Sequence, residues 1–149
     1  MLMFMKTLNN ISRSQATYRY GKISKNVGDL QAGHYSYALA ICRDPGRSQE
    51  ELARELCVNK STVARNLNYL ENKGYITRIP LPHDRRHLSV HPTEKLLSAV
   101  PYIKEASIEW MTLLSEGIPK EELDTFNNVL MRMQERAREI IEKQGANLP

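Results

Sequence analysis

The sequence has few of the features that make a protein exported, membrane-bound or disulfide-stabilised. Only two of its 149 residues are cysteine, Cys42 and Cys57, which is too few for a disulfide scaffold. Its apolar stretches are far shorter than the roughly 20 residues that a membrane-spanning helix needs. The apolar start over residues 1–5 is interrupted at once by Lys6, so it lacks the core of a signal peptide. We therefore expect a cytoplasmic protein.

Signatures of catalysis are also missing. The sequence contains no glycine-rich phosphate loop, no serine-centred nucleophile elbow and no pair of catalytic carboxylates. His83-Asp84 resembles the paired ligands of metal-dependent phosphohydrolases, but such a site needs further His and Asp residues on helices. This pair is in a segment bounded by prolines. We therefore expect a protein that is not an enzyme and that holds no cofactor.

Charge is distributed unevenly along the chain, whose net charge is +4 at pH 7. Residues 1–42 have a balance of +4, residues 43–93 a balance of +3, and residues 94–149 a balance of −3. Within the middle block, residues 60–93 contain six Lys or Arg but only two acids. A basic segment beside an acidic one indicates a surface that faces a polyanion.

Apolar periodicity predicts long helices in both terminal parts of the chain. One helix is expected over about residues 7–27 and another over about 32–42, which the turn triplet Asp44-Pro45-Gly46 ends. Two more are expected over about 94–114 and 120–143. The last helix carries an apolar stripe that is too long for a small lobe to bury alone. This stripe consists of Leu123, Phe126, Leu130, Met133, Ala137, Ile140 and Ile141.

The middle of the chain carries the clearest local signals. Ser48-Gln49-Glu50-Glu51 has the pattern of a capping box and opens a short helix. After the turn Cys57-Val58-Asn59, the asparagine is expected to cap a second helix over residues 60–73. Gly74 suits the C-terminal cap of that helix. The apolar face of the second helix consists of Val63, Leu67 and Leu70.

Beyond Gly74 the apolar period changes from that of a helix to that of a strand. Residues 75–79 and 88–90 are expected to pair as an antiparallel hairpin, with the charged segment 80–87 as its loop. Two short helices joined by a three-residue turn and followed by a β-hairpin form a winged helix-turn-helix. The expected fold is therefore mainly α with a small β-hairpin wing.

The second short helix has the composition of a DNA recognition helix. Short hydroxyl side chains near its N-terminus allow a close approach to phosphates, which the helix dipole also favours. Arg65 and Asn66 are of the types that bind guanine and adenine edges in the major groove. We therefore expect double-stranded DNA as the partner. The candidate DNA contacts are Ser48, Gln49, Lys60, Ser61, Thr62, Arg65, Asn66, Arg85 and Arg86.

Several short runs occur in a specific order over about residues 8–145. They are Leu30–Tyr35, Ser48–Ala53, Asn59–Arg65, Leu70–Ile76, Asp84–Arg86 and Pro92–Lys95. Together they resemble the MarR (multiple antibiotic resistance regulator) family of transcriptional regulators. In the first run this sequence has His34 where the family usually has Gln.

The resemblance implies a division of labour along the chain. Residues 1–29 and 94–149 would form a helical dimerisation region, and residues 30–93 a winged lobe that binds DNA. Asp84 would orient the wing by charge-assisted hydrogen bonds. Arg85 or Arg86 would enter the minor groove.

The resemblance also implies how such a protein would work. A homodimer would bind a pseudo-palindromic operator, act by family default as a repressor of a nearby operon, and be released by a small phenolic or anionic ligand. The ligand would occupy a crevice between the dimer helices and the DNA-binding lobe. By position, the crevice is expected to be bordered by Arg13, His34, Tyr35, Tyr37 and Arg86.

Three alternatives remain at this point. His83, His87 and His91 recur every four residues, and a hairpin could bring the first two together in a metal-responsive regulator of the same fold. Cys42 or Cys57 could sense redox state, although both are expected to be small buried apolar residues. A helical protein-interaction module that does not bind DNA is the third, and salt-sensitive duplex binding would exclude it.

Overall fold

The computed structural model describes residues 2–81 and 84–143. In this part of the chain the elements follow the order α1 (Leu2–Ile23), η1 (Ala32–His34), α2 (Tyr35–Arg43), β1 (Arg47–Ser48), α3 (Gln49–Leu56), α4 (Lys60–Asn72), β2 (Ile76–Leu81), β3 (Asp84–Pro92), α5 (Glu94–Leu114) and α6 (Lys120–Lys143). The expectation of a mainly α fold with a small β-hairpin wing is confirmed.

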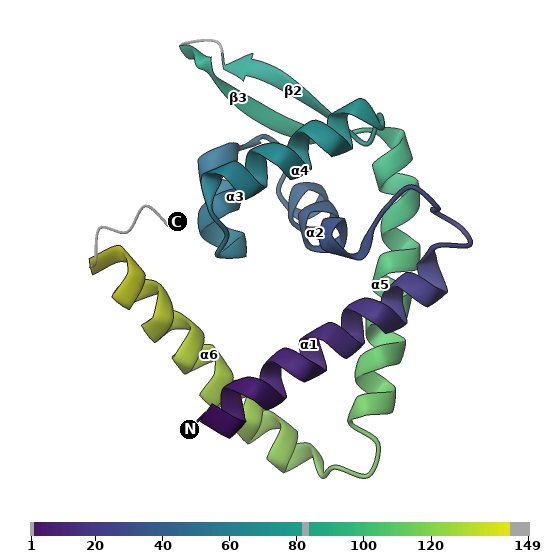
Figure 1. Cartoon of the computed structure of the whole chain (residues 1–149), viewed down its shortest axis with the longest axis vertical. Coiled ribbons are helices and arrows are strands. Elements are labelled where there is room, and N and C mark those ends of the chain that lie inside the picture. Colours follow the sequence, from purple (N-terminus) through teal and green to yellow (C-terminus); the bar gives the residue numbers. More distant parts are fainter. Residues whose placement is uncertain (1, 82–83, 144–149) are drawn as a thin grey trace.

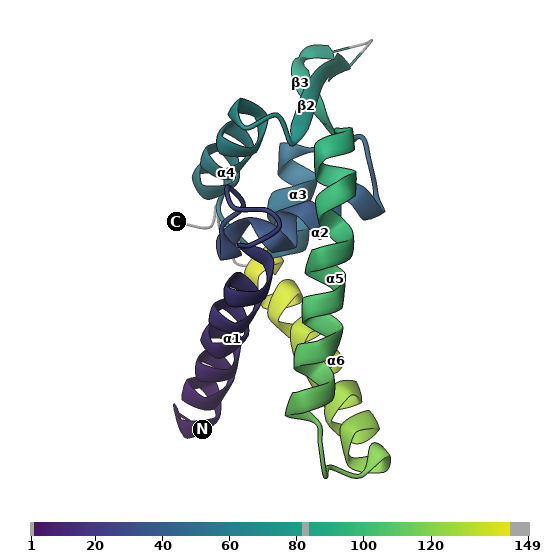
Figure 2. The same ribbon diagram turned by 90° about the vertical axis from the view of Figure 1, so that its right-hand side faces the viewer.

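The elements are arranged in two parts. The winged lobe, formed by α2, α3, α4 and the strands, gathers at one end of the molecule (Figure 1). The helical frame, formed by α1, α5 and α6, extends away from the lobe as three long rods. The perpendicular view shows the same arrangement, with the wing at one end and the N-terminus and the turn between α5 and α6 at the other (Figure 2). No helix among residues 2–81 and 84–143 is long and apolar enough to cross a membrane.

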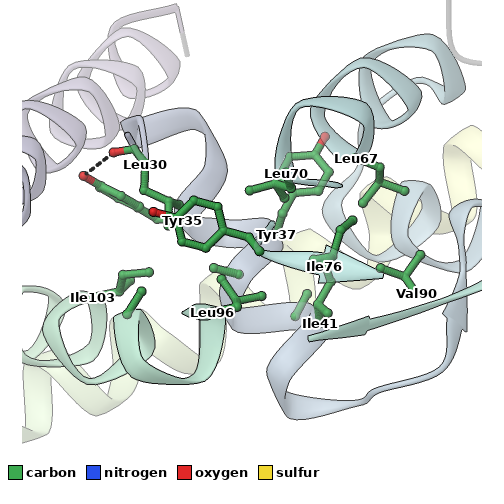
Figure 3. Close-up of a cluster of buried hydrophobic side chains, with 14 of the residues drawn as sticks. Leu30, Tyr35, Tyr37, Ile41, Leu67, Leu70, Ile76, Val90, Leu96 and Ile103 are labelled. Carbon is green, nitrogen blue, oxygen red and sulfur yellow. Dashed lines mark hydrogen bonds between the residues drawn. The ribbon is translucent and has the colours of Figure 1, made fainter. Parts of the chain in front are cut away.

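The core of the winged lobe is built from the apolar faces of its helices and strands. The predicted inner face of α4, Val63, Leu67 and Leu70, is completely buried. Side chains of α2, β2, β3 and α5 converge on the same cluster (Figure 3). This packing fixes which side of α4 faces outward, because a fully buried stripe leaves only the opposite side to solvent.

The sheet is a three-stranded antiparallel sheet of order β1-β3-β2. The expected loop over residues 80–87 is wrong in its extent, because β2 continues to Leu81 and β3 begins at Asp84. Pro80 is tolerated within β2 because β2 is an edge strand, where one side of the backbone needs no partner. The pairing is irregular between Pro80 and Leu81. The wing is therefore a longer strand ladder than the sequence indicates.

Within the frame, α1 and α5 contact each other. The rings of Tyr18 and Trp110 lie 5.3 Å apart, and Lys22 Nζ lies 2.7 Å from Glu109 Oε1. Helix α1 begins and ends earlier than the expected range 7–27, and its last residue, Ile23, is buried in the lobe core. The frame therefore meets the lobe at the end of α1 and along the first half of α5, where Leu96 and Ile103 are buried in the same core.

Candidate nucleic-acid interface

Helix α4 begins at the cap that the sequence predicts. The side chain of Asn59 accepts a hydrogen bond from the backbone N–H of Thr62 at 2.7 Å and from the hydroxyl of Ser61 at 2.9 Å. The cap leaves the N-terminus of α4 at the surface, where Lys60 and Ser61 are exposed. A helix N-terminus with a positive dipole end and a lysine is a favourable place for a phosphate.

Helix α3 is fixed to the start of α4. Ser48 and Glu51 form the predicted capping box, in which each side chain accepts from the other's backbone N–H. Gln49 Nε2 donates to the backbone carbonyl of Lys60 at 3.4 Å. The hydroxyl of Ser48 also donates to Glu51, so this predicted DNA contact already serves the helix cap.

The outward face of α4 carries the charges with the greatest freedom to bind a ligand. Lys60 and Arg65 are exposed. No hydrogen bond or ion pair joins the side chain of either residue to another residue that the structure describes. The two cations are thus available to a polyanion without the loss of an existing bond.

Asn66 lies differently from its neighbour Arg65. Its Nδ2 donates to the Tyr37 hydroxyl at 3.3 Å and to the backbone carbonyl of Thr62 at 2.9 Å. The side chain is half-buried between α4 and α2. The structure therefore separates the two predicted base-reading residues and places only Arg65 on the outward face.

The wing extends from the same lobe. Asp84, Arg85 and Arg86 begin β3, and Asp84 pairs with Leu81 of β2. The side chains of these three predicted site residues lie outside the part of the chain that the structure describes, as does the whole of residues 82–83. The backbone places the two arginines next to the tip of the hairpin (Figure 1).

An arginine of the wing, which the sequence analysis missed, is bonded to the recognition helix. Arg78 of β2 donates from Nε to Glu71 Oε2 at 2.9 Å and from Nη2 to Asn68 Oδ1 at 2.7 Å. It also forms an ion pair with Glu71, and this bonding lowers the pKa of the Glu71 carboxyl. An acid on the last turn of a helix and a base on the next strand were the only sequence signal.

Asp29, also missed, lies in the turn after α1 and is bonded to α4, to α5 and to the segment between α4 and β2. Its carboxylate accepts from the hydroxyl of Tyr75 and from Lys95 Nζ, the latter at 2.9 Å, and its backbone carbonyl accepts from the Tyr69 hydroxyl at 2.6 Å. Lys95 also donates to the backbone carbonyl of Lys73 at 2.8 Å. The bonds from Tyr75 and Lys95 lower the pKa of Asp29, and burial beside that carboxylate raises the pKa of Tyr75.

Known proteins are similar to this chain in both sequence and architecture. The family model that matches residues 28–87 is described as the MarR family. The uncharacterized HTH-type transcriptional regulator YybA of Bacillus subtilis is 30% identical over 118 residues, which cover 77% of this chain and 79% of that protein. The chain belongs to the MarR family.

Solved MarR-family structures extend the likeness to nearly the whole chain. A MarR transcriptional regulator from Methanosarcina mazei Go1 is 26% identical with a TM-score of 0.84, and the match covers 94% of this chain and 99% of that one. A MarR family regulator from Listeria monocytogenes in complex with 26mer DNA has a TM-score of 0.84 at 22% identity, with 95% and 94% covered. The chain is thus a DNA-binding transcriptional regulator and not an enzyme.

Three of the residues expected to border a ligand crevice in this MarR-family chain are aromatic. His34, Tyr35 and Tyr37 are buried in the lobe. His34 stacks on Tyr69 with ring centroids 4.4 Å apart, and its Nδ1 accepts from the backbone N–H of Gln31 at 3.2 Å. Burial lowers the pKa of His34.

Two arginines were also expected at that crevice. Arg13 is exposed on α1, and the side chain of Arg86 lies outside the described part of the chain. The arginine of α1 that approaches the lobe is Arg19, whose guanidinium lies 5.5 Å from the centre of the Tyr35 ring. Arg19 also donates to the Ser107 hydroxyl at 3.5 Å, so it joins α1, α2 and α5.

An apolar hollow lies in the helical frame. It has a volume of about 630 Å³ and lies between α1, α5 and α6. Met111, Leu114 and Phe126 line it and are 40–50% exposed. Large exposed apolar patches are unusual on monomeric proteins and mark binding surfaces.

The residues of the metal and redox alternatives lie only partly within the described part of the chain. His83 and the side chain of His87 lie outside the described part of the chain, while His91 lies against Ser89, with 3.0 Å between Nε2 and Oγ. Among the described residues no group of three potential metal ligands comes together. Cys42 is half-buried, which raises its pKa, whereas Cys57 is exposed and does not match the expectation of burial.

Proposed function

We propose that this MarR-family chain is a repressor of a nearby operon, that it binds a pseudo-palindromic operator as a homodimer, and that a small phenolic or anionic ligand releases it. The observation that carries the proposal is the outward face of α4, where Lys60 and Arg65 are exposed and unbonded within the described part of the chain. Because the inner face of α4 is fully buried, the outward face is the one that would contact DNA.

Recognition would take place through α4 in the major groove. Arg65 would read a guanine edge, while Lys60 and the helix N-terminus would hold phosphates together with Ser48, Gln49, Ser61 and Thr62. The Listeria monocytogenes neighbour, bound to 26mer DNA, supports the same kind of partner for this chain. Asn66 would support the helix through Tyr37.

The wing would read the flanks of the site. Arg85 and Arg86 begin β3 beside the hairpin tip, where little apolar surface has to be buried around them. A narrow A·T-rich minor groove concentrates negative potential and favours an inserted arginine, with Asp84 orienting the wing. We therefore expect A·T-rich flanks outside each half-site.

Dimerisation would use the helical frame, residues 1–29 and 94–149, and DNA binding the lobe of residues 30–93. The exposed side chains of Met111, Leu114 and Phe126 support this division, since a second copy would remove them from water. A two-fold axis would place the two copies of α4 about one helical turn of DNA apart, roughly 34 Å.

Ligand release would act at the junction of frame and lobe. Arg19 is half-buried there, above the ring of Tyr35 and next to Ser107. A guanidinium beside an aromatic ring suits an anionic aromatic ligand. The predicted border residues Arg13, His34, Tyr37 and Arg86 belong to the same proposal.

The test starts from a random pool of duplexes. The full chain should select a sequence with two related half-sites, and binding to it should weaken steeply with salt. Sedimentation at low micromolar concentration should give about twice the chain mass of 17.1 kDa. Phenolic carboxylates added to the complex should release the duplex. Selection of no sequence, or a monomer in the bound state, would refute the proposed mode of action.

A further inference from the structure

The contact between the wing and the recognition helix is built from three side chains. Arg78 of β2 donates from Nε to Glu71 Oε2 at 2.9 Å and from Nη2 to Asn68 Oδ1 at 2.7 Å. Glu71 and Asn68 are three residues apart on α4, so they lie on the same face of the helix. The side chain of Arg78 is 19% exposed and that of Glu71 36%, which shields the pair from water better than a free surface ion pair.

The bonds of Arg78 restrain the angle between β2 and α4 as well as the distance between them. A guanidinium is planar and its donors are rigidly arranged, so bonds to two points on one helix fix its orientation. The chain between α4 and β2 is short, and it turns at Gly74, whose φ is +74°. The position that a Cβ at Gly74 would occupy is open, whereas Tyr75 and Ile76 after it are buried in the lobe core. The bonds of Arg78 lie farther along β2 and add a second restraint on the direction of the wing.

The charge of Glu71 argues against a role in electrostatic attraction. Residues 60–93 contain six bases and only two acids, and Glu71 is one of these acids, on the recognition helix itself. A carboxylate near DNA phosphates opposes binding. Glu71 nevertheless lies on a helix that otherwise attracts a polyanion. This is explained if its bond to Arg78 strengthens DNA binding by more than its negative charge weakens it.

We propose that Arg78, Glu71 and Asn68 form a bracket that holds the wing at the angle at which β2–β3 and α4 engage DNA together. These are positioning residues, and none of them needs to touch DNA. The inference rests on the proposed DNA-binding mode. It adds the side-chain contact that couples the two DNA-binding parts, α4 and the wing. Without the bracket, α4 and the wing would each still bind phosphates, but the wing would sample angles that miss the flank of the operator.

The decisive variant is Glu71→Gln, because the two roles predict opposite changes in operator affinity. If Glu71 acts only through its charge, the affinity should rise; if it positions the wing, the affinity should fall. Loss of a carboxylate should by charge alone tighten binding to any duplex. Loss of the bracket should weaken binding to the selected operator by about tenfold, the size of a coupling between contacting residues. Glu50→Gln is the matched control, since Glu50 is exposed on α3 in the same lobe and has no side-chain partner among the described residues.

A second variant, Arg78→Lys, keeps the positive charge and removes the planar two-point fork. It should lower operator affinity as Glu71→Gln does and leave random-duplex binding near wild type. The double variant should lose no more operator affinity than the worse single variant, because both break the same bracket. Thermal unfolding of each variant, measured in parallel, reports any loss of folded protein.

The outcomes separate the possible roles. Operator binding by Glu71→Gln that equals or exceeds the wild type would overturn the bracket. Wild-type binding by Arg78→Lys would assign Arg78 to a phosphate contact. Equal losses on operator and random duplex, accompanied by a lower unfolding temperature, would make the contact purely structural. A wild-type chain that selects no operator would refute the proposed function instead.

Discussion

The winged lobe and the helical frame differ in how far their large apolar side chains are exposed. In the lobe, Leu67, Leu70 and Ile76 are at most 1% exposed, whereas in the frame Met111, Leu113 and Phe126 are 46–53% exposed. The charge of the frame is divided along the chain, with a balance of +4 over residues 1–42 and −3 over residues 94–149, whereas residues 43–93 of the lobe have a balance of +3. The apolar residues of the lobe therefore form a closed core, whereas the frame leaves large apolar side chains at its surface.

The largest effect is expected from a charge placed in the frame. Phe126→Glu should produce a monomer, because a carboxylate in the apolar hollow would be buried by the partner without compensation. Loss of the second recognition helix should weaken operator binding by about 10²–10⁴-fold. Sedimentation and duplex titration measure the two effects. Thr125→Glu, at the exposed neighbouring position, should remain a dimer, and a dimeric Phe126→Glu variant would exclude the hollow from the interface.

The next largest effect is expected at the tip of the wing. Replacement of Arg85 and Arg86 by Ala should lower operator affinity by about a hundredfold and reduce the log–log salt slope by about two units. Lys25→Ala combined with Lys104→Ala removes the same charge outside the lobe and should have little effect. Circular dichroism should stay near wild type for both. Normal operator binding by the wing variant would make the wing a purely structural element.

Within the lobe, specificity and general affinity should separate at two exposed cations. Arg65→Ala should cost about 1–3 kcal/mol on the operator and little on random DNA, since it removes a base contact. Lys60→Ala should weaken both alike, as expected for a phosphate contact. Titrations against both duplexes at one salt concentration make the comparison. Equal losses for Arg65→Ala on the two duplexes would contradict base reading.

A smaller effect is expected at Asp29, where frame and lobe meet. Its carboxyl pKa is lowered in the fold, so its contribution to stability is present above the unfolded pKa of about 4 and is lost as pH falls through the lower folded value. Because the side chain is 37% exposed, Asp29→Asn should cost at most about 1 kcal/mol at pH 7. Denaturant titrations at pH 7 and pH 3 should show the difference shrink in acid. A constant difference would assign the effect to packing.

The smallest effect is expected at the turn of the helix-turn-helix. Cys57 caps α3 in the left-handed region, with φ of 53°. Cys57→Gly should stabilise the chain by up to about 1 kcal/mol in denaturant titrations, because glycine adopts this conformation without a Cβ clash. Cys57→Ala keeps the Cβ and should give no gain. A gain for alanine equal to that for glycine would trace the effect to the thiol.

Local signals in the sequence predicted much of the lobe. The capping box at Ser48 and Glu51 and the cap at Asn59 lie within one helical turn of the groups that they bond, so the bounds of α3 and α4 could be predicted. The wing was predicted too short because its length depends on cross-strand pairing, such as that of Leu81 with Asp84.

The contacts that position the site were beyond sequence patterns. Tyr75 and Asp29 are 46 residues apart, and only the folded chain brings them together. Asn66 and Arg65 are adjacent in the sequence and both polar, yet they lie on different sides of α4, since the helical rotation of about 100° per residue turns one toward Tyr37. Residue type indicated chemistry at both positions, and orientation decided which of them faces outward.

The short strand β1 links the wing to α3, the first helix of the helix-turn-helix. Ser48 pairs with Ser89 of β3 and is at the same time the N-cap of α3, so one residue belongs to the wing ladder and to the first helix of the motif. Release of that pairing would also loosen the cap. In hydrogen exchange, the amides at the base of the wing and in the first turn of α3 should therefore become accessible in a single cooperative event, at one common opening free energy.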